Sequence, residues 1–536
     1  MADKNVITFD STLRDGSQAE DVSFSLEDKL GITQKLDDLG IHYVEGGFPG
    51  SNPKDEAYFR EVRKLKLKNT KIVAFGSTHN PKNRPANDTN LKLLASCGAD
   101  AVTIVGKSWD IHVKHVLRVS NEKNLEIIRG SAAYLAKKVK EVMYDAEHFF
   151  DGYKADPEYA LETLKAARDG GAGWLVLCDT NGGALPHEVM STVAEVKKQL
   201  GGDIAIHCHN DSDLGVANTI AAVSAGARQV QGTINGIGER CGNANLCSII
   251  PTLQLKMGYK CIPPSNMKKL KEVSLYTSEM ANMKHRTHQP YVGNSAFAHK
   301  GGLHVDAVLK NSRTYEHVEP ETVGNKRRIL VSDLAGKGTI TSKAEEFGID
   351  LSKKKSLVVE LATAIKELEN QGSLFEAADG SLNILMKKKS GQWKKKFDVI
   401  RARTIVSISS DQSHPFAEAV VMVRTPDGET HHAVAEGNGP VNAMDKAARS
   451  ALIGYYPELE DIKLLDFKVR ILDETSGSKA KTRVLIESGD SSGNKWGTVG
   501  VSENIIEACW QALIDSIDYK LHQSKKNNPR RTGKGK

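Results

Sequence analysis

Short apolar runs alternate with longer segments of helical periodicity along the first half of the chain. The runs are four to six residues long and favour buried strands, with a helix after each strand. Eight such repeats favour a closed (β/α)8 barrel, or TIM barrel, over an open doubly wound sheet. The eight runs lie at residues 6–9, 43–46, 72–75, 101–105, 142–146, 174–178, 204–209 and 230–234.

Four of the connecting segments carry the clearest helical pattern. Their apolar residues recur every three or four positions, as on one face of an amphipathic helix. The last of them opens with Asp211, Ser212 and Asp213, which are candidates for its N-cap. The four predicted helices cover residues 25–39, 157–169, 187–200 and 213–225.

The pattern changes twice after the eighth run. Residues 263–400 are lysine-rich and largely helical in periodicity, so we expect accessory helical subdomains there. Over residues 401–522, short strand-like runs are followed twice by a helical stretch, which predicts an α+β domain of two similar halves. The barrel is then expected over residues 1–262, and the basic residues 523–536 are expected to form a disordered, solvated tail.

Composition narrows the class of protein. With 39% hydrophobic and 26% charged residues, the chain of 536 residues can bury several cores, which excludes global disorder. Seven cysteines without a C-x-x-C pair favour reduced thiols over disulfides or a zinc-thiolate site. No apolar run reaches the roughly 18 residues of a membrane span, and no secretory segment opens the chain. We therefore expect a cytoplasmic protein with neither a membrane nor a nucleic-acid partner.

Polar motifs follow nearly every one of the eight runs. D-S-T-L-R-D-G follows the first run, H-N-D the seventh, and N-G-I-G-E-R-C-G-N the eighth. In a TIM barrel the carboxyl ends of all strands meet at one face, and that face carries the active site. We therefore expect the chemistry of this protein at the mouth formed by these motifs.

His207 and His209 are the first candidates for a metal site. Side chains two apart on a strand point to the same face, so both imidazoles can meet one ion. Asp15 follows the first strand, which neighbours the eighth in a closed barrel, and Asn243 can add a carbonyl oxygen. These ligands suit Mn²⁺ or Mg²⁺, with Zn²⁺, Co²⁺ and Fe²⁺ left open. Alone, the two histidines are more often structural; the barrel context favours the metal.

Three of these motifs resemble the signature of a known family. F-D-S-T-L-R-D-G-S-Q (9–18), H-C-H-N-D (207–211) and N-G-I-G-E-R-C-G-N (235–243) are similar to those of the acyl-CoA Claisen-condensing synthases. The family contains 2-isopropylmalate, homocitrate and citramalate synthases. G-G-L-H-V-D (301–306) resembles its accessory-subdomain motif, and residues from 401 onward resemble its C-terminal regulatory domain. The resemblance thus covers essentially the whole chain.

Within this family, residues 45–55 and 146–154 are most similar to the members that use pyruvate. The resemblance then implies condensation of acetyl-CoA with pyruvate and thioester hydrolysis to citramalate and CoA. It assigns Arg14 and the metal to polarising the keto group, where the metal acts as a Lewis acid. It assigns Gln18 to supporting this arrangement and Thr180 to binding the pyruvate carboxylate.

The family's general base aligns with Glu147, which would take a proton from the acetyl methyl group. His148 follows it where family members often carry Asp. From the accessory subdomain, the resemblance implies that His304, Asp306 and Tyr315 close over the site, where they activate water or protonate the alkoxide. The C-terminal domain resembles an amino-acid-binding module, which implies a homodimer inhibited by isoleucine, with leucine as the alternative effector.

Other interpretations stay open at this stage. The acceptor could be 2-oxoisovalerate, which would make the protein a 2-isopropylmalate synthase. A biotin-type carboxyltransferase or decarboxylase is disfavoured because Cys178 stands where those barrels place lysine, and a lyase running the reverse cleavage is separated only by assay. A non-catalytic regulatory barrel conflicts with the joint presence of the site residues. Glu45 is interpreted as a brace for the barrel rim.

Overall fold

The computed structural model describes residues 4–351, 354–408, 416–473, 477 and 479–523. The predicted basic tail, apart from Gln523, lies outside the described residues. The chain divides into two compact units, each described here by itself. One consists of residues 1–297 and 316–327, and the other of residues 298–315 and 328–536. The domain boundaries expected after residues 262 and 400 stay predictions.

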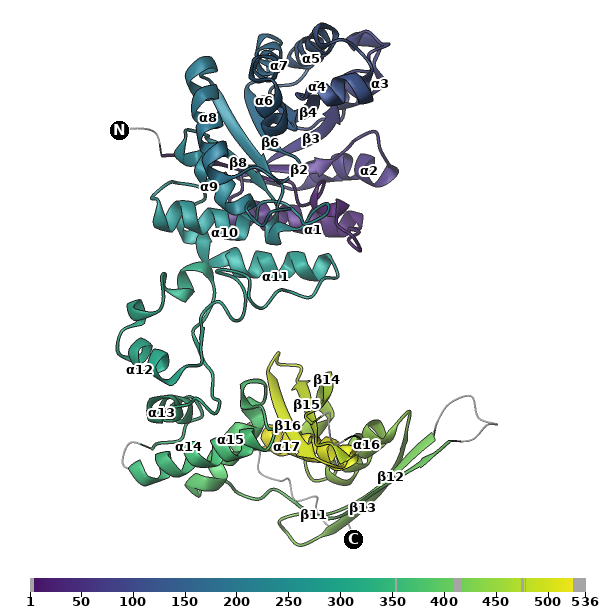
Figure 1. Ribbon diagram of the computed structural model, residues 1–536. Helices are drawn as coiled ribbons and strands as arrows, with labels where there is room; N and C mark the ends of the chain where they lie inside the picture. The colour runs from purple at the N-terminus through teal and green to yellow at the C-terminus, as the bar shows by residue number, and fades with distance from the viewer. Residues whose placement is uncertain (1–3, 352–353, 409–415, 474–476, 478, 524–536) are drawn as a thin grey trace. The chain divides into compact units, whose positions relative to one another are not determined.

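The first unit contains a closed barrel of eight parallel strands, with β1 paired to both β2 and β8. Each predicted apolar run overlaps one strand, so the predicted TIM barrel is confirmed (Figure 1). The strands are β1 (Ile7–Asp10), β2 (Tyr43–Gly47), β3 (Lys71–Ser77), β4 (Ala101–Lys107), β5 (Val142–Glu147), β6 (Trp174–Asp179), β7 (Asp203–Cys208) and β8 (Gln229–Gly232).

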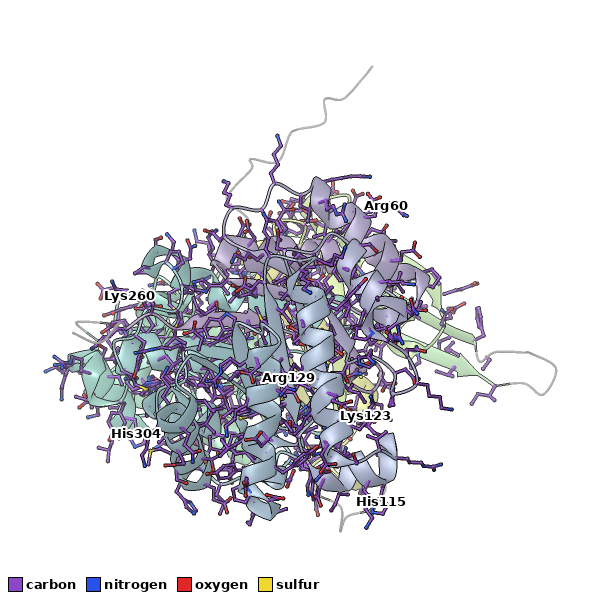
Figure 2. All side chains as sticks on the ribbon, turned by 90° about the horizontal axis from the view of Figure 1, so that it is seen from above. Arg60, His115, Lys123, Arg129, Lys260 and His304 are labelled. Carbon is purple, nitrogen blue, oxygen red and sulfur yellow. The ribbon has the colours of Figure 1, made fainter. Side chains whose placement is uncertain are left out.

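Helices cover the outside of the barrel. On α5, Ile127 and Ile128 are buried, whereas Lys123 and Arg129 are exposed, as Figure 2 shows. α1 begins after Ser25, whose hydroxyl forms a capping box with Asp28. The helices are α1 (Leu26–Leu39), α2 (Pro53–Glu61), α3 (Thr89–Ser96), α4 (Asp110–His112), α5 (Asn121–Ala136), α6 (Phe149–Ala155), α7 (Pro157–Asp169), α8 (Pro186–Leu200), α9 (Gly215–Ser224), α10 (Leu246–Pro251) and α11 (Leu270–Met280).

The predicted N-cap of α9 is wrong, because none of the candidates Asp211, Ser212 and Asp213 occupies that position. The helix begins at Gly215 after Leu214, which has no polar side chain. The Gly215 N–H instead donates to Oδ1 of Asn210, at 3.0 Å, and Asp211 is held in an ion pair with Arg240. The tertiary contact with the loop after β8 therefore takes Asp211 away from the helix.

The barrel interior changes from apolar to polar toward the carboxyl ends of the strands. Tyr43, Met143 and Ala205 belong to buried apolar layers inside the barrel. Because side chains alternate along a strand, the residues two positions further on point the same way, toward the mouth. They include Glu45, Asp145 and His207, all buried. Strand alternation thus brings ionisable groups into one place that water barely reaches.

The second unit combines helices with two antiparallel sheets. β11, β12 and β13 form one sheet followed by α16, and β14, β15 and β16 form another followed by α17 (Figure 1). α16 and α17 pack into one apolar core, which confirms the predicted α+β domain of two similar halves. The elements are β9 (Ala298–His299), α12 (Gly302–Lys310), β10 (Arg328–Ile329), α13 (Lys337–Glu346), α14 (Lys355–Asn370), α15 (Asp379–Ser390), β11 (Asp398–Ser407), β12 (Phe416–Arg424), β13 (Thr430–Gly437), α16 (Pro440–Leu452), β14 (Lys463–Ile471), β15 (Thr482–Gly489), β16 (Lys495–Ser502) and α17 (Ile505–Gln523). Within the described ranges, every helix is too short or too polar to cross a lipid bilayer.

Candidate active site

Asp15, His207 and His209 meet at the barrel mouth. Asp15 follows β1, His207 lies on β7, and His209 follows β7 directly. Oδ2 of Asp15 lies 3.7 Å from Nε2 of His207 and 3.9 Å from Nε2 of His209. One donor atom from each residue lies within 4.8 Å of the others, a spacing that one metal ion can bridge. The structure thus brings together the three residues that the sequence proposed as ligands.

The protonation states of these three side chains suit a cation-binding site. Burial and the neighbouring His209 lower the pKa of His207 to about 3, so its ring is neutral at pH 7. Nδ1 of His207 donates to Oε1 of Gln231, at 3.1 Å, which leaves the lone pair of Nε2 facing Asp15. Burial acts to raise the pKa of Asp15, but the positive charge of Arg14 and the hydrogen bond from Asn243 act in the opposite direction, and this pKa lies well below its usual range. Asp15 is therefore an anion beside two neutral imidazoles.

Asn243 reaches the same cluster from the loop after β8. Its Nδ2 donates to Oδ1 of Asp15, at 2.8 Å. Its Oδ1 is buried without a hydrogen-bond partner among the described residues, and the same holds for Nδ1 of His209. Buried polar atoms are rarely left unpaired, so these two atoms indicate a site shaped for a further polar occupant. Whether Asn243 ligates a metal stays a prediction.

Arg14 is held in place by two carboxylates and an aromatic ring. Nη1 lies 3.0 Å from Oδ2 of Asp15, and Nε lies 2.7 Å from Oε2 of Glu45. The guanidinium carbon stands 4.0 Å from the centre of the Phe75 ring. Ser11 donates to the same oxygen of Glu45. The guanidinium is thus fixed beside the proposed metal ligands before any substrate binds.

Two site residues were missed or undervalued from the sequence. Glu45 makes the bracing hydrogen bonds that we expected, but they orient Arg14 at the centre of the site. Asp145, buried on β5, was not considered. Burial and the charge of Glu45 raise its pKa well above the usual value, and its Oδ1 has no partner among the described residues. The signal for Asp145 was its position, two residues before Glu147 on one strand face.

On the opposite side of the mouth, Glu147 ends β5 and forms an ion pair with Lys107 at the end of β4. Thr180, after β6, accepts a hydrogen bond from the backbone N–H of His148, at 2.9 Å. Because the loops after β5 and β6 are joined in this way, Glu147 and Thr180 belong to one side of the mouth. Gln18, by contrast, is exposed at the end of a short 3-10 helix (Gly16–Gln18).

The remaining predicted residues lie in the second unit. The His304 ring, labelled in Figure 2, stacks on the Tyr315 ring with centroids 4.2 Å apart. Asp306 pairs with Lys310 one turn further along α12, at 2.6 Å. His304 and Tyr315 are exposed within this unit. The closure of these residues over the barrel mouth stays a prediction.

A parallel eight-stranded barrel with two imidazoles and a carboxylate at its mouth defines a class of enzymes suited to metal-assisted chemistry on small oxygen-rich substrates. Sequence comparison narrows the class. The chain belongs to the HMGL-like family, whose family model matches residues 5–275. Residues 291–373 match the "homocitrate synthase post-HMGL domain-like" model, and residues 376–521 match the "LeuA allosteric (dimerisation) domain" model.

Individual relatives align with the chain over nearly its whole length. It is 54% identical to an (R)-citramalate synthase of Geobacter sulfurreducens, over 96% of this chain and 97% of the relative. It is 54% identical to the (R)-citramalate synthase of Aquifex aeolicus, over 97% of this chain and 98% of the relative. Identity falls to 32% with a 2-isopropylmalate synthase of Methanocaldococcus jannaschii, over 97% and 96% of the two chains.

Proposed function

We propose that the chain condenses acetyl-CoA with pyruvate and water to give (R)-citramalate and CoA, a step that feeds isoleucine biosynthesis. The observation that carries this proposal is the identity of 44–54% to (R)-citramalate synthases of five organisms, over almost the full chain. Two relatives named as a 2-isopropylmalate synthase and a probable 2-isopropylmalate synthase stand at 32% and 31%. The alternative acceptor, 2-oxoisovalerate, is therefore disfavoured.

The residues at the mouth can divide the reaction between them. A divalent metal, which we take to be Mn²⁺ or Mg²⁺ rather than Zn²⁺ or Co²⁺, would be held by Asp15, His207 and His209 and would supply Lewis acidity to the keto group. Arg14, fixed by Glu45, donates to the oxygen on which negative charge develops. The Thr180 hydroxyl donates to the carboxylate of pyruvate.

Glu147 is the proposed base. Its carboxylate takes a proton from the methyl group of acetyl-CoA, and the resulting carbon nucleophile attacks the keto carbon of pyruvate. In this structure the carboxylate of Glu147 forms an ion pair with Lys107 at the end of β4. His304 and Tyr315, assisted by Asp306, then protonate the alkoxide or activate the water that cleaves the thioester.

The second unit supports a proposal about assembly and regulation. β11 and β14 each form one edge of a three-stranded sheet, and both carry large apolar side chains that are 36–54% exposed. Such exposed apolar area marks an interaction surface. Together with the match to a dimerisation domain over residues 376–521, this supports a homodimer whose regulatory domain binds isoleucine.

Release of free thiol from acetyl-CoA tests the function directly. We expect release with pyruvate, little with 2-oxoisovalerate or 2-oxoglutarate, and none after treatment with EDTA until a divalent metal is restored. Preference for 2-oxoisovalerate would move the assignment to 2-isopropylmalate synthesis. Full turnover in EDTA, with metal analysis showing an empty protein, would remove the proposed role of Asp15 and the two histidines.

A further inference from the structure

His148, the residue directly after Glu147, has a left-handed backbone conformation, with φ of 54° and ψ of 36°. It stands between the end of β5 and the start of α6. Residues with a side chain adopt this conformation rarely, and histidine, asparagine and aspartate do so more often than β-branched residues. Strained backbone of this kind persists only where the surrounding structure holds it, and it is frequent at functional sites. The reaction steps proposed above leave His148 without a role.

The backbone of His148 ties Glu147 to Thr180. Its N–H donates to Oγ1 of Thr180, at 2.9 Å, which joins the end of β5 to the loop after β6. A hydroxyl that accepts this bond keeps its own proton for another acceptor, and no other described residue takes that proton. The donating N–H belongs to the peptide bond between Glu147 and His148. The direction of the Glu147 side chain and that of the Thr180 hydroxyl therefore depend on one backbone geometry.

Aromatic rings from the segment after β4 pack against His148. The centre of its ring lies 4.3 Å from that of His112 and 5.8 Å from that of Trp109, and these two rings stack on each other. The side chain of His148 is 12% exposed, and its Nδ1 lies 3.4 Å from Oδ2 of Asp151. Asp151 also accepts a hydrogen bond from Nδ2 of Asn181, at 2.9 Å, in the loop after β6. The ring is thus held by contacts that reach the segments after β4, β5 and β6.

The carbonyl oxygen of His148 is fixed as well. It accepts a hydrogen bond from the N–H of Gly152, at 2.9 Å, in the first turn of α6. A β-carbon at Gly152 would come within 2.3 Å of the carbonyl oxygen of Ser108, so this turn lies directly against the segment after β4. Glycine is required there because of this close approach. The N–H, the ring and the carbonyl group of His148 therefore each have a defined partner.

We propose that His148 is a positioning residue, whose left-handed backbone sets Glu147 and the hydroxyl of Thr180 at a fixed separation. Its ring, packed against the aromatic side chains after β4, holds that backbone in place. This inference rests on the proposed function, in which Glu147 takes a proton from acetyl-CoA and Thr180 binds the carboxylate of pyruvate. The carbon nucleophile formed beside one residue must attack the molecule held by the other. A misplacement of about 1 Å can lower turnover by about a hundredfold.

Two substitutions in the full-length protein separate the backbone from the ring. His148→Asn and His148→Val both remove the ring, but asparagine tolerates the left-handed conformation and valine does not. We expect kcat to fall by about threefold in His148→Asn and by at least about thirtyfold in His148→Val. In His148→Val the KM for pyruvate should rise because the hydroxyl of Thr180 loses its orientation, whereas the KM for acetyl-CoA should stay within about twofold.

An isotope effect reports on the base itself. A displaced Glu147 makes cleavage of the methyl C–H bond slower, so the deuterium isotope effect on kcat, measured with acetyl-CoA labelled at its methyl group, should increase in His148→Val. A variant that is only less stable would keep the isotope effect of the wild type. If valine prevents folding, His148→Ala, which strains the backbone less, should show the same changes at a smaller size.

Asp21→Val is the matched control. Asp21 is an exposed residue in the segment before α1, and its φ of 62° means that valine causes a comparable backbone strain there. The midpoint of thermal unfolding should fall in both valine variants, but kcat, the KM for pyruvate and the isotope effect should change only in His148→Val. An equal loss of kcat in His148→Asn and His148→Val would overturn the proposed role of the backbone.

Thr180→Val tests the connection through the hydroxyl. It removes the acceptor of the His148 N–H, so the effect of His148→Val on the KM for pyruvate should disappear when both substitutions are combined. Additive losses in the double variant would contradict the proposal. If the wild type releases no thiol with pyruvate, the proposed function fails and this inference fails with it. If the wild type is active and His148→Val has the same kcat, KM values and isotope effect, only the positioning role is wrong.

Discussion

The barrel mouth and the outer strands of the C-terminal domain depart from an ordinary protein surface in opposite ways. The mouth buries charged groups, such as Arg14 and Glu45, in a place where water could not stabilise them. The strands β11 and β14 instead leave apolar side chains such as Phe467 and Ile471 exposed. Neither arrangement is the most stable for an isolated chain. Both fit the proposals made above, in which the mouth binds a cation and small substrates and the strands bind a second chain.

The largest effect is expected from Asp15→Asn. The substitution keeps the size of the side chain but removes the anion between the two imidazoles, so both the metal and the position of Arg14 are affected. We expect kcat to fall by on the order of a thousandfold, as for loss of a main electrostatic contributor. Metal content by mass spectrometry should fall in parallel. The control Asp203→Asn, at an exposed position at the opposite end of β7, should leave both kcat and metal content unchanged. Full activity in Asp15→Asn would show that the proposed metal site is wrong.

Asp10, buried at the end of β1, allows the energetic cost of burying a carboxylate there to be measured. Burial raises its pKa to about 7, against an ordinary value of 3.8. Between these two values the folded state binds more protons than the unfolded state, so this group's contribution to stability falls as the pH rises. A shift of this size corresponds to roughly 4 kcal/mol. We therefore expect Asp10→Asn to gain stability relative to the wild type as the pH rises from 4 to 8. Denaturant unfolding at both pH values measures this difference in the free energy of unfolding. An equal difference at pH 4 and pH 8 would contradict the prediction.

Glu45→Gln should have a smaller effect on turnover. It keeps a side chain able to accept a hydrogen bond but removes the charge that pairs with Nε of Arg14. We expect kcat to fall about tenfold, since a charged hydrogen bond is replaced by a neutral one. The KM for acetyl-CoA should stay within twofold. A pure loss of thermal stability with unchanged kcat would return Glu45 to the role of a rim brace.

The smallest effect on turnover is expected at the exposed strands. Phe467→Glu places a charge on the apolar face of β14, and we expect analytical ultracentrifugation to show a shift from dimer to monomer. Inhibition by isoleucine should weaken, while basal kcat stays within about twofold because the barrel is untouched. Val116→Glu, at an exposed apolar position in the barrel unit, serves as control and should leave the oligomeric state unchanged. A monomeric wild type would show that the exposed strands do not form a dimer interface.

Local sequence patterns predicted much of the fold and part of the candidate site. The eight apolar runs predicted eight strands because each strand is buried on both faces and therefore reads as a short continuous run. The metal cluster followed from two rules that need no coordinates. Residues two apart on a strand share a face, and in a closed barrel the first strand neighbours the last.

The contacts missed from the sequence are those that join different loops. The bond between Arg14 and Glu45 links the ends of β1 and β2, and the ion pair of Asp211 with Arg240 links the loops after β7 and β8. Periodicity along one segment says nothing of the partner that a side chain meets on the next.

The sequence by itself determined the barrel, the α+β domain and the types of ligand available at the mouth, because strand alternation and motif chemistry are local properties. Only the tertiary structure decided which charges neutralise one another there, and which polar atoms of the described residues stay without hydrogen-bond partners. These depend on barrel closure and on burial, since both the distance between two groups and the water around them are set by the packed chain as a whole.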